Sequence, residues 1–282
     1  MNQQTQRVID YYQSTYSDYK NLWTGNRDLA IHFGYYDDKT KKHSDAVIRL
    51  NQVLAEYAKI SKDDHVLDAG CGYGGSSIWL AQNIGCKVTG ITIVPFQVEI
   101  GSREIQNRQL SDKVELLNQD FTNINFPNET FSVYWALESI VHAQDRSKVL
   151  SEAHRLLKKD GRLIVAEYTY REGPSLSKAE LNYMNPWLNG WAMPQLLTKS
   201  EYERQLAEAG FKNIKSYDIT GQVKPSLKRL KVLCTIFLPG AKLLRSLGIF
   251  NWQRTANVEG SLRQAKALDK GLWNYSIFVA EK

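Results

Sequence analysis

Cysteine and long apolar runs are both scarce in this sequence. Its 282 residues include only Cys71, Cys86 and Cys234, whose spacing matches neither a disulfide framework nor a metal-binding motif. We therefore expect reduced thiols in a cytoplasmic protein that has no bound metal. The longest apolar run, 232–238, is too short to cross a bilayer, and the opening residues lack the apolar core of a signal peptide.

Acidic residues are missing from the segment 219–258. It contains seven Lys or Arg residues, whereas the whole chain has a net charge of only +6. A solvated basic surface is the simpler interpretation. Attraction to an anionic substrate, or peripheral contact with a membrane surface, is the alternative.

Helical and strand patterns alternate between residues 45 and 170. We expect helices at 45–60, 76–83, 95–109 and 146–157, and strands at 65–69, 87–92, 114–118, 131–137 and 162–168. This alternation is typical of a parallel sheet with helices on both faces. After a further helix at 199–209, strands at 211–219 and 274–281 are expected to form an antiparallel pair at the sheet edge. The predicted fold is a doubly wound, Rossmann-like α/β domain with a seven-stranded sheet.

We expect a single domain over all 282 residues. In this prediction, residues 1–60 form an N-terminal helical cap and residues 61–170 form the cofactor-binding core. Residues 171–198 contain three prolines and many aromatic side chains, and 220–270 is a long irregular insert with one possible helix near 237–250. We expect both segments to be lids over the substrate.

Three glycines follow the first predicted strand, within the stretch VLDAGCGYGG. Gly70, Gly72 and Gly74 can adopt positive φ and allow a ligand to approach the backbone closely. In a doubly wound sheet, ligands bind at this end of the strands. A G-x-G pattern also occurs in NAD enzymes, but these usually place an acid at the end of the second strand, where this chain has Thr92.

Four stretches together resemble class I S-adenosylmethionine-dependent methyltransferases. VLDAGCGYGG resembles their first motif, and VTGITIVPFQVE resembles the second-strand motif of the branch containing sterol, tocopherol, sugar and cyclopropane-type enzymes. NQDFTNINFPNETFSVYWALESIVHAQD and the N-terminal YYQSTYSDYKNLW…IHFGYY are similar to further parts of the same site. The resemblance covers residues 10–170 and is weak over 171–260, where the substrate is selected.

The resemblance implies roles for residues in the core motifs. Thr92 and Gln97 would hold the ribose of S-adenosylmethionine. Asp120 would accept a hydrogen bond from the adenine amino group, with Phe121 beside the ring. The backbone of Leu137 would face the amino group of the methionine part.

Further cofactor contacts are expected from the first motif and the N-terminal helix. Asp68 would orient the glycine loop or reach the cofactor ammonium group through water. Tyr12, Tyr19, Trp23 and His32 match recurring positions of this branch, where the N-terminal helix closes over the cofactor. For Tyr12 and Tyr19, simple core packing is the alternative.

Methyl transfer to oxygen or nitrogen often needs a general base, whereas transfer to an alkene needs aromatic faces or a carboxylate that stabilise positive charge. The candidates at the sheet edge are Glu138, His142 and Glu167. Related sugar O-methyltransferases carry two adjacent histidines, but here Val141 precedes His142, so the familiar base is in doubt. A structural role is the alternative for both His142 and Glu167.

Aromatic side chains near the end of the fifth strand and in the first lid are the substrate candidates. Tyr168, Tyr170, Tyr183, Trp187 and Trp191 would wall an apolar or aromatic pocket, and an aromatic core beneath a lid is the equal alternative. The predicted function is methyl transfer from S-adenosylmethionine to an isoprenoid, phenolic or other specialised metabolite, at carbon or oxygen. The alternatives are an RNA methyltransferase, an NAD-binding oxidoreductase and a non-catalytic cofactor-binding scaffold.

Overall fold

The structure is a computed structural model that describes residues 2–24 and 29–282. Its centre is an eight-stranded sheet. Seven strands follow the order β3-β2-β1-β4-β5-β8-β7, and the short strand β6 pairs with β5 outside this order. The strands are β1 (His65–Ala69), β2 (Lys87–Thr92), β3 (Val114–Asn118), β4 (Phe131–Leu137), β5 (Leu157–Tyr170), β6 (Leu197–Thr198), β7 (Lys212–Asp218) and β8 (Trp273–Glu281). Strands β1 to β5 are parallel, and β8 runs antiparallel to both β5 and β7. The predicted doubly wound sheet with an antiparallel edge pair is confirmed, and β6 is an addition to it.

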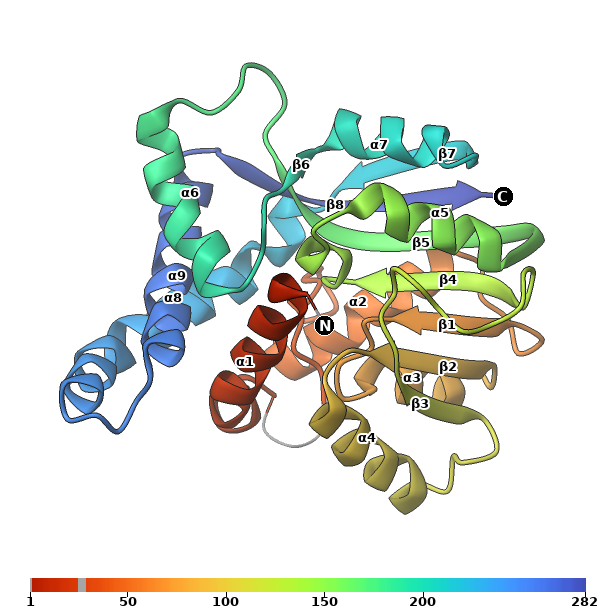
Figure 1. Cartoon of the computed structure of the whole chain (residues 1–282), viewed down its shortest axis with the longest axis horizontal. Coiled ribbons are helices and arrows are strands. Elements are labelled where there is room, and N and C mark those ends of the chain that lie inside the picture. The colour runs from red at the N-terminus through yellow and green to blue at the C-terminus, as the bar shows by residue number, and fades with distance from the viewer. Residues whose placement is uncertain (1, 25–28) are drawn as a thin grey trace.

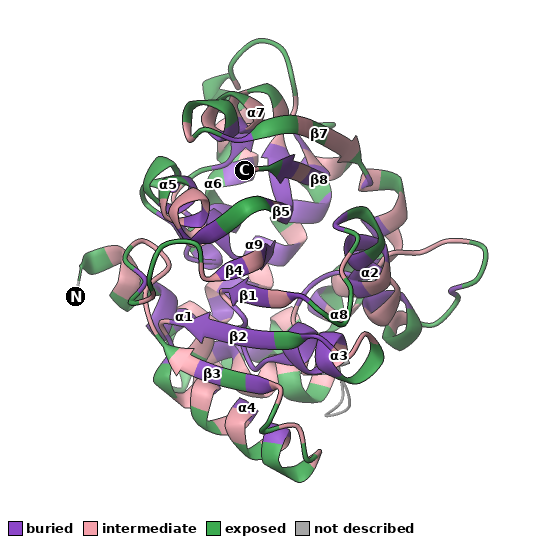
Figure 2. Cartoon of the chain, turned by 90° about the vertical axis from the view of Figure 1, so that its right-hand side faces the viewer, coloured by how far each residue is buried: buried purple, intermediate pink, exposed green. Residues whose placement is uncertain are grey.

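Helices cover both faces of the sheet. One face carries α2 (His43–Tyr57), α3 (Gly75–Asn83) and α4 (Pro95–Asn107), and the other carries α5 (Arg146–Leu156) and α7 (Lys199–Glu208). Strand β4 shows why both faces of the sheet must be covered by helices. Its apolar side chains alternate, so that Val133 and Trp135 enter one core, while Tyr134 and Ala136 enter the other. All four side chains are buried, and the central strands in Figure 2 are purple along most of their length.

A second group of helices lies beyond the carboxyl ends of the parallel strands (Figure 1). It consists of α1 (Gln3–Asp18), a π-helical turn (Tyr19–Thr24), α6 (Lys178–Gly190), α8 (Thr220–Ser246) and α9 (Trp252–Asp269). Helix α9 contacts α1, α6 and α8, and therefore joins the group. Because ligands of doubly wound sheets bind at this edge, these helices are placed to cover a site.

The expectation of an irregular insert at 220–270 is wrong, because this segment forms the two helices α8 and α9. Two prolines, Pro225 and Pro239, lie inside α8, although proline usually kinks or ends a helix. Pro225 lies in the second turn of the helix, so each of the two prolines removes one backbone donor from the helix interior. The buried positions of α8 include Val223, Leu227, Cys234 and Ala241, whose spacing of four and seven residues forms one apolar face. Packing of this face overrides the local signal from proline.

Candidate active site

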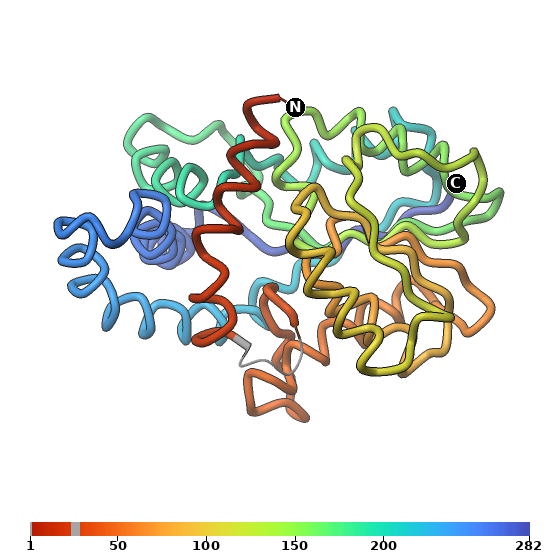
Figure 3. The backbone as a smooth tube through the Cα atoms, turned by 60° about the horizontal axis from the view of Figure 1, so that its bottom comes forward, coloured from red at the N-terminus to blue at the C-terminus, as the bar shows by residue number. Residues whose placement is uncertain are grey.

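Three cavities lie in a row at the carboxyl ends of the strands, and α1 contributes residues to the wall of each. Figure 3 shows α1, in red, with the sheet on one side and α8 and α9, in blue, on the other. We call them the inner, middle and outer cavities, with volumes of about 300, 50 and 400 Å³. The inner and middle cavities share Tyr12, Gly70, Gly72 and His142 as lining residues. The middle and outer cavities share Tyr19, Ile31 and Trp191. The shared residues show that the cavities are direct neighbours.

The glycine loop forms the wall between the inner and middle cavities. Gly70 has a φ of +83°, and a Cβ atom there would collide with the side chain of Ser139. Gly72 has a φ of +55°, and its Cβ would meet only Ile31, at 3.5 Å, because the remaining space is cavity. Gly74 lines neither cavity and starts the turn into α3, whose first residue is Gly75. The loop thus brings backbone, rather than side chains, against a ligand.

Thr92 and Gln97 lie together on the wall of the inner cavity. The Thr92 hydroxyl donates to Oε1 of Gln97 at 2.8 Å and accepts from the backbone N–H of Val94 at 3.2 Å. This contact fixes the Gln97 amide, whose buried Nε2 has no hydrogen-bond partner among the described residues. A buried donor without a partner costs free energy. A ribose hydroxyl of the expected cofactor would supply the missing acceptor.

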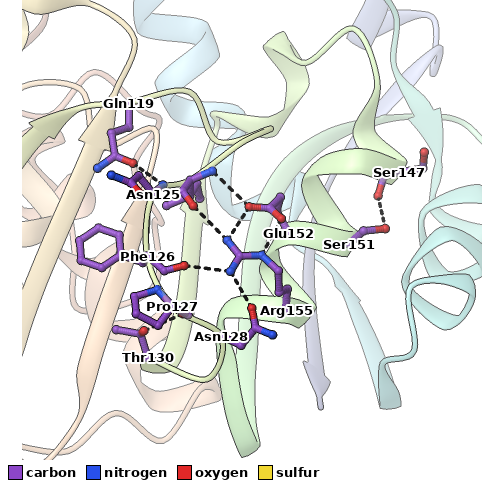
Figure 4. A network of polar contacts seen from close by, with 11 residues as sticks. Gln119, Asn125, Phe126, Pro127, Asn128, Thr130, Ser147, Ser151, Glu152 and Arg155 are labelled. Carbon is purple, nitrogen blue, oxygen red and sulfur yellow. Dashed lines mark hydrogen bonds and ion pairs between the residues drawn. The ribbon is translucent and has the colours of Figure 1, made fainter.

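Asp120 and Phe121 line the inner cavity from the loop between β3 and β4. Thr122 donates to one Asp120 oxygen, Oδ1, through its backbone N–H at 2.8 Å and its hydroxyl at 2.7 Å. Farther along, Arg155 of α5 holds the loop by donating to the carbonyls of Ile124 and Phe126, at 3.0 and 2.9 Å (Figure 4). The loop is therefore fastened to α5, which fixes the position of Asp120 and Phe121.

Asp68 and Leu137 line the middle cavity from the ends of β1 and β4. Asp68 is almost fully buried and accepts a hydrogen bond from the Ser77 hydroxyl at 2.6 Å. Burial raises the pKa of the Asp68 carboxyl to about 7, and the Ser77 hydrogen bonds oppose this rise. An ammonium group of a bound ligand would lower this pKa again and keep the carboxylate charged.

His142 belongs to both the inner and middle cavities and does not line the outer one. Its Nδ1 lies 3.3 Å from the backbone carbonyl of Ala192, so this nitrogen carries the hydrogen. Its Nε2 is then free to accept a hydrogen bond from the Tyr12 hydroxyl at 3.1 Å. Burial lowers the pKa of His142 to about 4, so the ring is neutral at physiological pH. The structure thus pairs two residues for which the sequence indicated separate roles.

Glu138 lines the middle cavity, where three donors hold its carboxylate. The backbone N–H of Phe33 and the hydroxyl of Tyr275 donate to Oε1 at 2.9 and 2.8 Å, and the Tyr168 hydroxyl donates to Oε2. Burial raises the pKa of Glu138 to about 7, although the hydrogen bonds from Tyr168, Phe33 and Tyr275 lower it. Its φ of +51° is unusual for a residue with a side chain. The protein therefore places a fixed carboxylate at this end of the sheet.

Glu167 does not line any of the three cavities. It is almost fully buried, and its Oε1 has no hydrogen-bond partner among the described residues. Burial raises its pKa to about 8, whereas the Arg146 charge and the backbone N–H groups of Val141 and Ser139 lower it. The location supports the structural alternative: Glu167 steadies the turn that carries His142.

The outer cavity is the largest of the three, and most of its residues were missed by the sequence analysis. Its wall is mainly apolar and comes from the π-helical turn, α8 and α9, with Leu230, Leu233, Phe237 and Leu244 among the α8 residues. The sequence analysis placed 220–270 in a lid over the substrate, with one possible helix near 237–250, but it named no individual substrate residue in this segment. Only the spacing of the apolar residues along α8 could have revealed it.

Two of the five predicted substrate residues reach these cavities. Trp191 lines the middle and outer cavities and Tyr168 lines the middle one, whereas Tyr170, Tyr183 and Trp187 line none of the three. Trp187 is fully buried, with its ring 5.3 Å from Tyr168 and 6.1 Å from Trp191. The Tyr183 ring instead lies 4.8 Å from Nζ of Lys270. For Trp187, the location supports the alternative of an aromatic core beneath a lid.

The chain is similar in sequence and fold to known methyltransferases. Residues 67–165 match the family model of a methyltransferase domain. The chain is 31% identical over 205 residues to 27-O-demethylrifamycin SV methyltransferase of Amycolatopsis mediterranei (strain S699), covering 73% of this chain and 73% of the relative. The chain belongs to the S-adenosylmethionine-dependent methyltransferases.

Two further similarities cover more of this methyltransferase. It is 26% identical over 280 residues to a probable chloroplastic tocopherol O-methyltransferase of Oryza sativa subsp. japonica, covering 95% of this chain and 76% of the relative. Its fold is similar to the crystal structure of the [4+2]-cyclase SpnF, with a TM-score of 0.82, 21% identity and coverage of 99% and 96%. Within the described part of the chain, no helix is long and apolar enough to cross a membrane. No group of three potential metal ligands occurs among the described residues either.

Proposed function

We propose that this methyltransferase acts on a neutral, largely apolar small metabolite that binds in the outer cavity. The observation that carries this proposal is the charge of the cavity wall. Among the described lining residues, only Asp18 and Arg254 are charged, and they form an ion pair with each other. An unpaired carboxylate, ammonium or diphosphate on the acceptor would find no opposite charge there, and its burial would be costly.

The residues around the inner and middle cavities fit S-adenosylmethionine. For the nucleoside part, the Gln97 amide supplies a hydrogen-bond donor, and the second carboxylate oxygen of Asp120 supplies a hydrogen-bond acceptor. For the ammonium group, Asp68 supplies a carboxylate. When bound, S-adenosylmethionine supplies an electrophilic methyl group together with its leaving group. The protein then mainly has to position the acceptor and exclude water.

Glu138 is the residue best placed to assist the acceptor. It lines the middle cavity, which borders both the inner and the outer cavity, and its three donors hold it in one orientation. With a hydroxyl acceptor, its carboxylate would take the proton. With an alkene acceptor, the same carboxylate would stabilise the positive charge that develops.

Tyr19 provides a polar contact where the middle and outer cavities meet. The Tyr11 hydroxyl donates to Oδ1 of Asn257 at 3.2 Å and lies 2.5 Å from the Tyr19 hydroxyl. The Tyr19 hydroxyl can donate or accept a hydrogen bond at this junction. This polar contact favours a methyl acceptor that carries a hydroxyl group.

The names of the relatives support the substrate class. One relative methylates a rifamycin precursor and the other is a probable tocopherol enzyme. We propose an isoprenoid, phenolic or polyketide-like acceptor of specialised metabolism, and a cytoplasmic location in keeping with three free, buried cysteines. The relatives give no support to an RNA methyltransferase or an NAD-dependent oxidoreductase.

A panel of acceptors tests this function. Purified protein would be incubated with S-adenosylmethionine and with prenylated phenols, polyketides, sarcosine or a prenyl diphosphate, and each product would be examined by mass spectrometry for one added methylene unit. We expect turnover with the neutral apolar compounds. Turnover confined to the charged compounds, or to RNA, would refute the proposal.

A further inference from the structure

We propose that the α8–α9 hairpin docks on an anionic membrane surface, so that the outer cavity takes up its lipophilic acceptor from the bilayer. The hairpin comprises residues 219–270 and projects away from the sheet, at the left of Figure 1. The inference extends the proposed function, because it names the source of the acceptor. Three independent features of the hairpin carry it.

The first feature is an apolar stripe on the solvent side of α8. Val232, Ile236, Leu243 and Leu247 follow one another at intervals of four, seven and four residues, so they share one face of the helix. Each is between 59% and 66% exposed, and Ile249 and Trp252 extend the stripe beyond the helix end with 65% and 52%. A contiguous exposed apolar surface of this kind marks an interaction site.

The second feature is the charge of the hairpin. It contains ten Lys or Arg residues and only two acids, a formal charge of +8, whereas the whole chain carries +6 and the remaining residues therefore carry −2. The two acids, Glu259 and Asp269, pair with Lys242 and Lys231 at 3.1 and 3.4 Å. Lys224, Lys228 and Arg245 are exposed on the same helix as the stripe. Basic side chains beside an apolar face are typical of helices that lie in the interface of anionic lipids.

The third feature is the link between the stripe and the cavity. Phe237 and Gly240 line the outer cavity and are also exposed, so the cavity reaches the surface along α8, next to the stripe. Leu233, Leu244 and Ala241 continue its wall inward along the same helix. A molecule that leaves the bilayer at the stripe can therefore enter the cavity without crossing water. A water-soluble partner protein would not need this connection.

Vesicle binding tests the proposal without any acceptor, so its failure is distinguishable from a failure of the proposed function. Wild-type protein would be sedimented with vesicles of pure phosphatidylcholine or of equal parts phosphatidylcholine and phosphatidylglycerol. We expect binding to the anionic vesicles, weakened by high salt because surface charges are screened. Tryptophan emission should shift to the blue on binding, and most of the shift should be lost in Trp252→Phe.

Two triple variants and a matched control locate the surface. The apolar variant carries Ile236→Gln, Leu243→Gln and Leu247→Gln, none of which lines the cavity, and the basic variant carries Lys224→Gln, Lys228→Gln and Arg245→Gln. The control removes the same charge at the amino-terminal ends of β5 and β7, with Lys158→Gln, Lys159→Gln and Lys212→Gln, which are also exposed.

We expect both hairpin variants to lose affinity for anionic vesicles by roughly tenfold or more, and the control to bind within about twofold of wild type. Unchanged thermal unfolding would show that the variants fold. Equal vesicle binding by all four proteins, or no binding by the wild type at low salt, would overturn the proposal. A concentration-dependent dimer that the apolar variant abolishes, without any vesicle binding, would instead assign the stripe to self-association.

Discussion

The hydroxyl of Tyr12 lies 3.1 Å from Nε2 of His142, and this contact ties α1 to the turn that follows β4. The same helix also reaches the turn through Gln4, whose Nε2 donates to the carbonyls of His142 and Ala192 at 3.0 and 2.7 Å. Both Tyr12 and His142 line the inner and middle cavities, so we propose that the contact closes the protein over the cofactor.

Loss of either partner should therefore weaken both catalysis and cofactor binding. We expect Tyr12→Phe and His142→Ala each to lower turnover by roughly tenfold to a hundredfold, with a double variant that is little worse, because the two residues act through one contact. Isothermal titration with S-adenosylhomocysteine and single-turnover rates would measure the two effects. Strictly additive losses would show that the residues act independently.

Gly72 should be required for the cofactor rather than for the fold. Gly72→Val places a branched side chain in the inner and middle cavities and should reduce cofactor affinity below detection. Gly85→Val is the matched control, because Gly85 also has a positive φ, +87°, and its Cβ would meet nothing closer than 3.6 Å. Calorimetry should show normal affinity in the control, with a similar loss of stability in both variants. Normal binding by Gly72→Val would refute the assignment of the loop.

Turnover should fall as the pH is lowered through about 7. The pKa of Glu138 is about 7 in the folded protein, and the carboxylate is the form that accepts a proton or faces a positive charge. Tyr275→Phe removes a donor to the carboxylate, so the pKa and the acidic limb of the kcat/KM profile should move to higher pH. Tyr202→Phe, which changes another buried tyrosine away from Glu138, should leave the limb in place. An unchanged limb in Tyr275→Phe would exclude Glu138 as the titrating group.

Filling the outer cavity should block the acceptor alone. Leu233→Trp adds bulk to the cavity wall, so we expect KM for the acceptor to rise by roughly tenfold or more while cofactor affinity stays unchanged. Thr235→Trp places the same ring on the exposed side of the same helix, outside the cavity and the apolar stripe, and is the control. Equal kinetics for the two variants would place the acceptor elsewhere.

Trp187 should matter for stability rather than for substrate selection. Its side chain is fully buried against Tyr168, Trp191 and Trp273. Trp187→Phe should lower the free energy of unfolding by about 1–3 kcal/mol, because the smaller ring leaves a cavity. KM for the acceptor should change less than in Leu233→Trp. A variant of normal stability with a strongly raised KM would restore the original expectation for this residue.

Glu167 should make the protein less stable as the pH rises. Its folded pKa of about 8 exceeds its ordinary value of 4.5, so between these values the folded state holds a proton that the unfolded state has lost. The free energy of unfolding therefore decreases from about pH 4.5 to about pH 8. Glu167→Gln removes this contribution, and its stability in urea should fall less steeply with pH than that of the wild type. Parallel pH profiles of the two proteins would contradict the raised pKa.

The sequence was informative wherever local pattern and chemistry coincide. Short buried strands such as β1 and β2 could be predicted because turns bound them. The glycine loop between β1 and α3 predicted a ligand site because closely spaced glycines allow a ligand to approach the backbone. The outer cavity could not be foreseen in the same way, because it forms where α1, α8 and α9 meet. The expected irregular insert is instead the helix α8, which continues through Pro239. The aromatic residues of 171–198 suggested a pocket, although Trp187 packs into a core. Composition alone does not distinguish a wall of a pocket from the interior of a fold.

One helix, α1, borders the inner, middle and outer cavities. We therefore expect the binding and release of the cofactor to be coupled to those of the methyl acceptor. Tyr12 closes the cofactor side, while Asp18 at the other end of α1 holds Arg254 of α9 beside the acceptor side. Lifting of α1 would break both contacts, so we expect release of the spent cofactor to open the acceptor compartment to solvent. Steady-state kinetics should consequently follow an ordered mechanism, in which the cofactor binds first and the demethylated cofactor dissociates last. Dissociation of the demethylated cofactor should be the rate-limiting step.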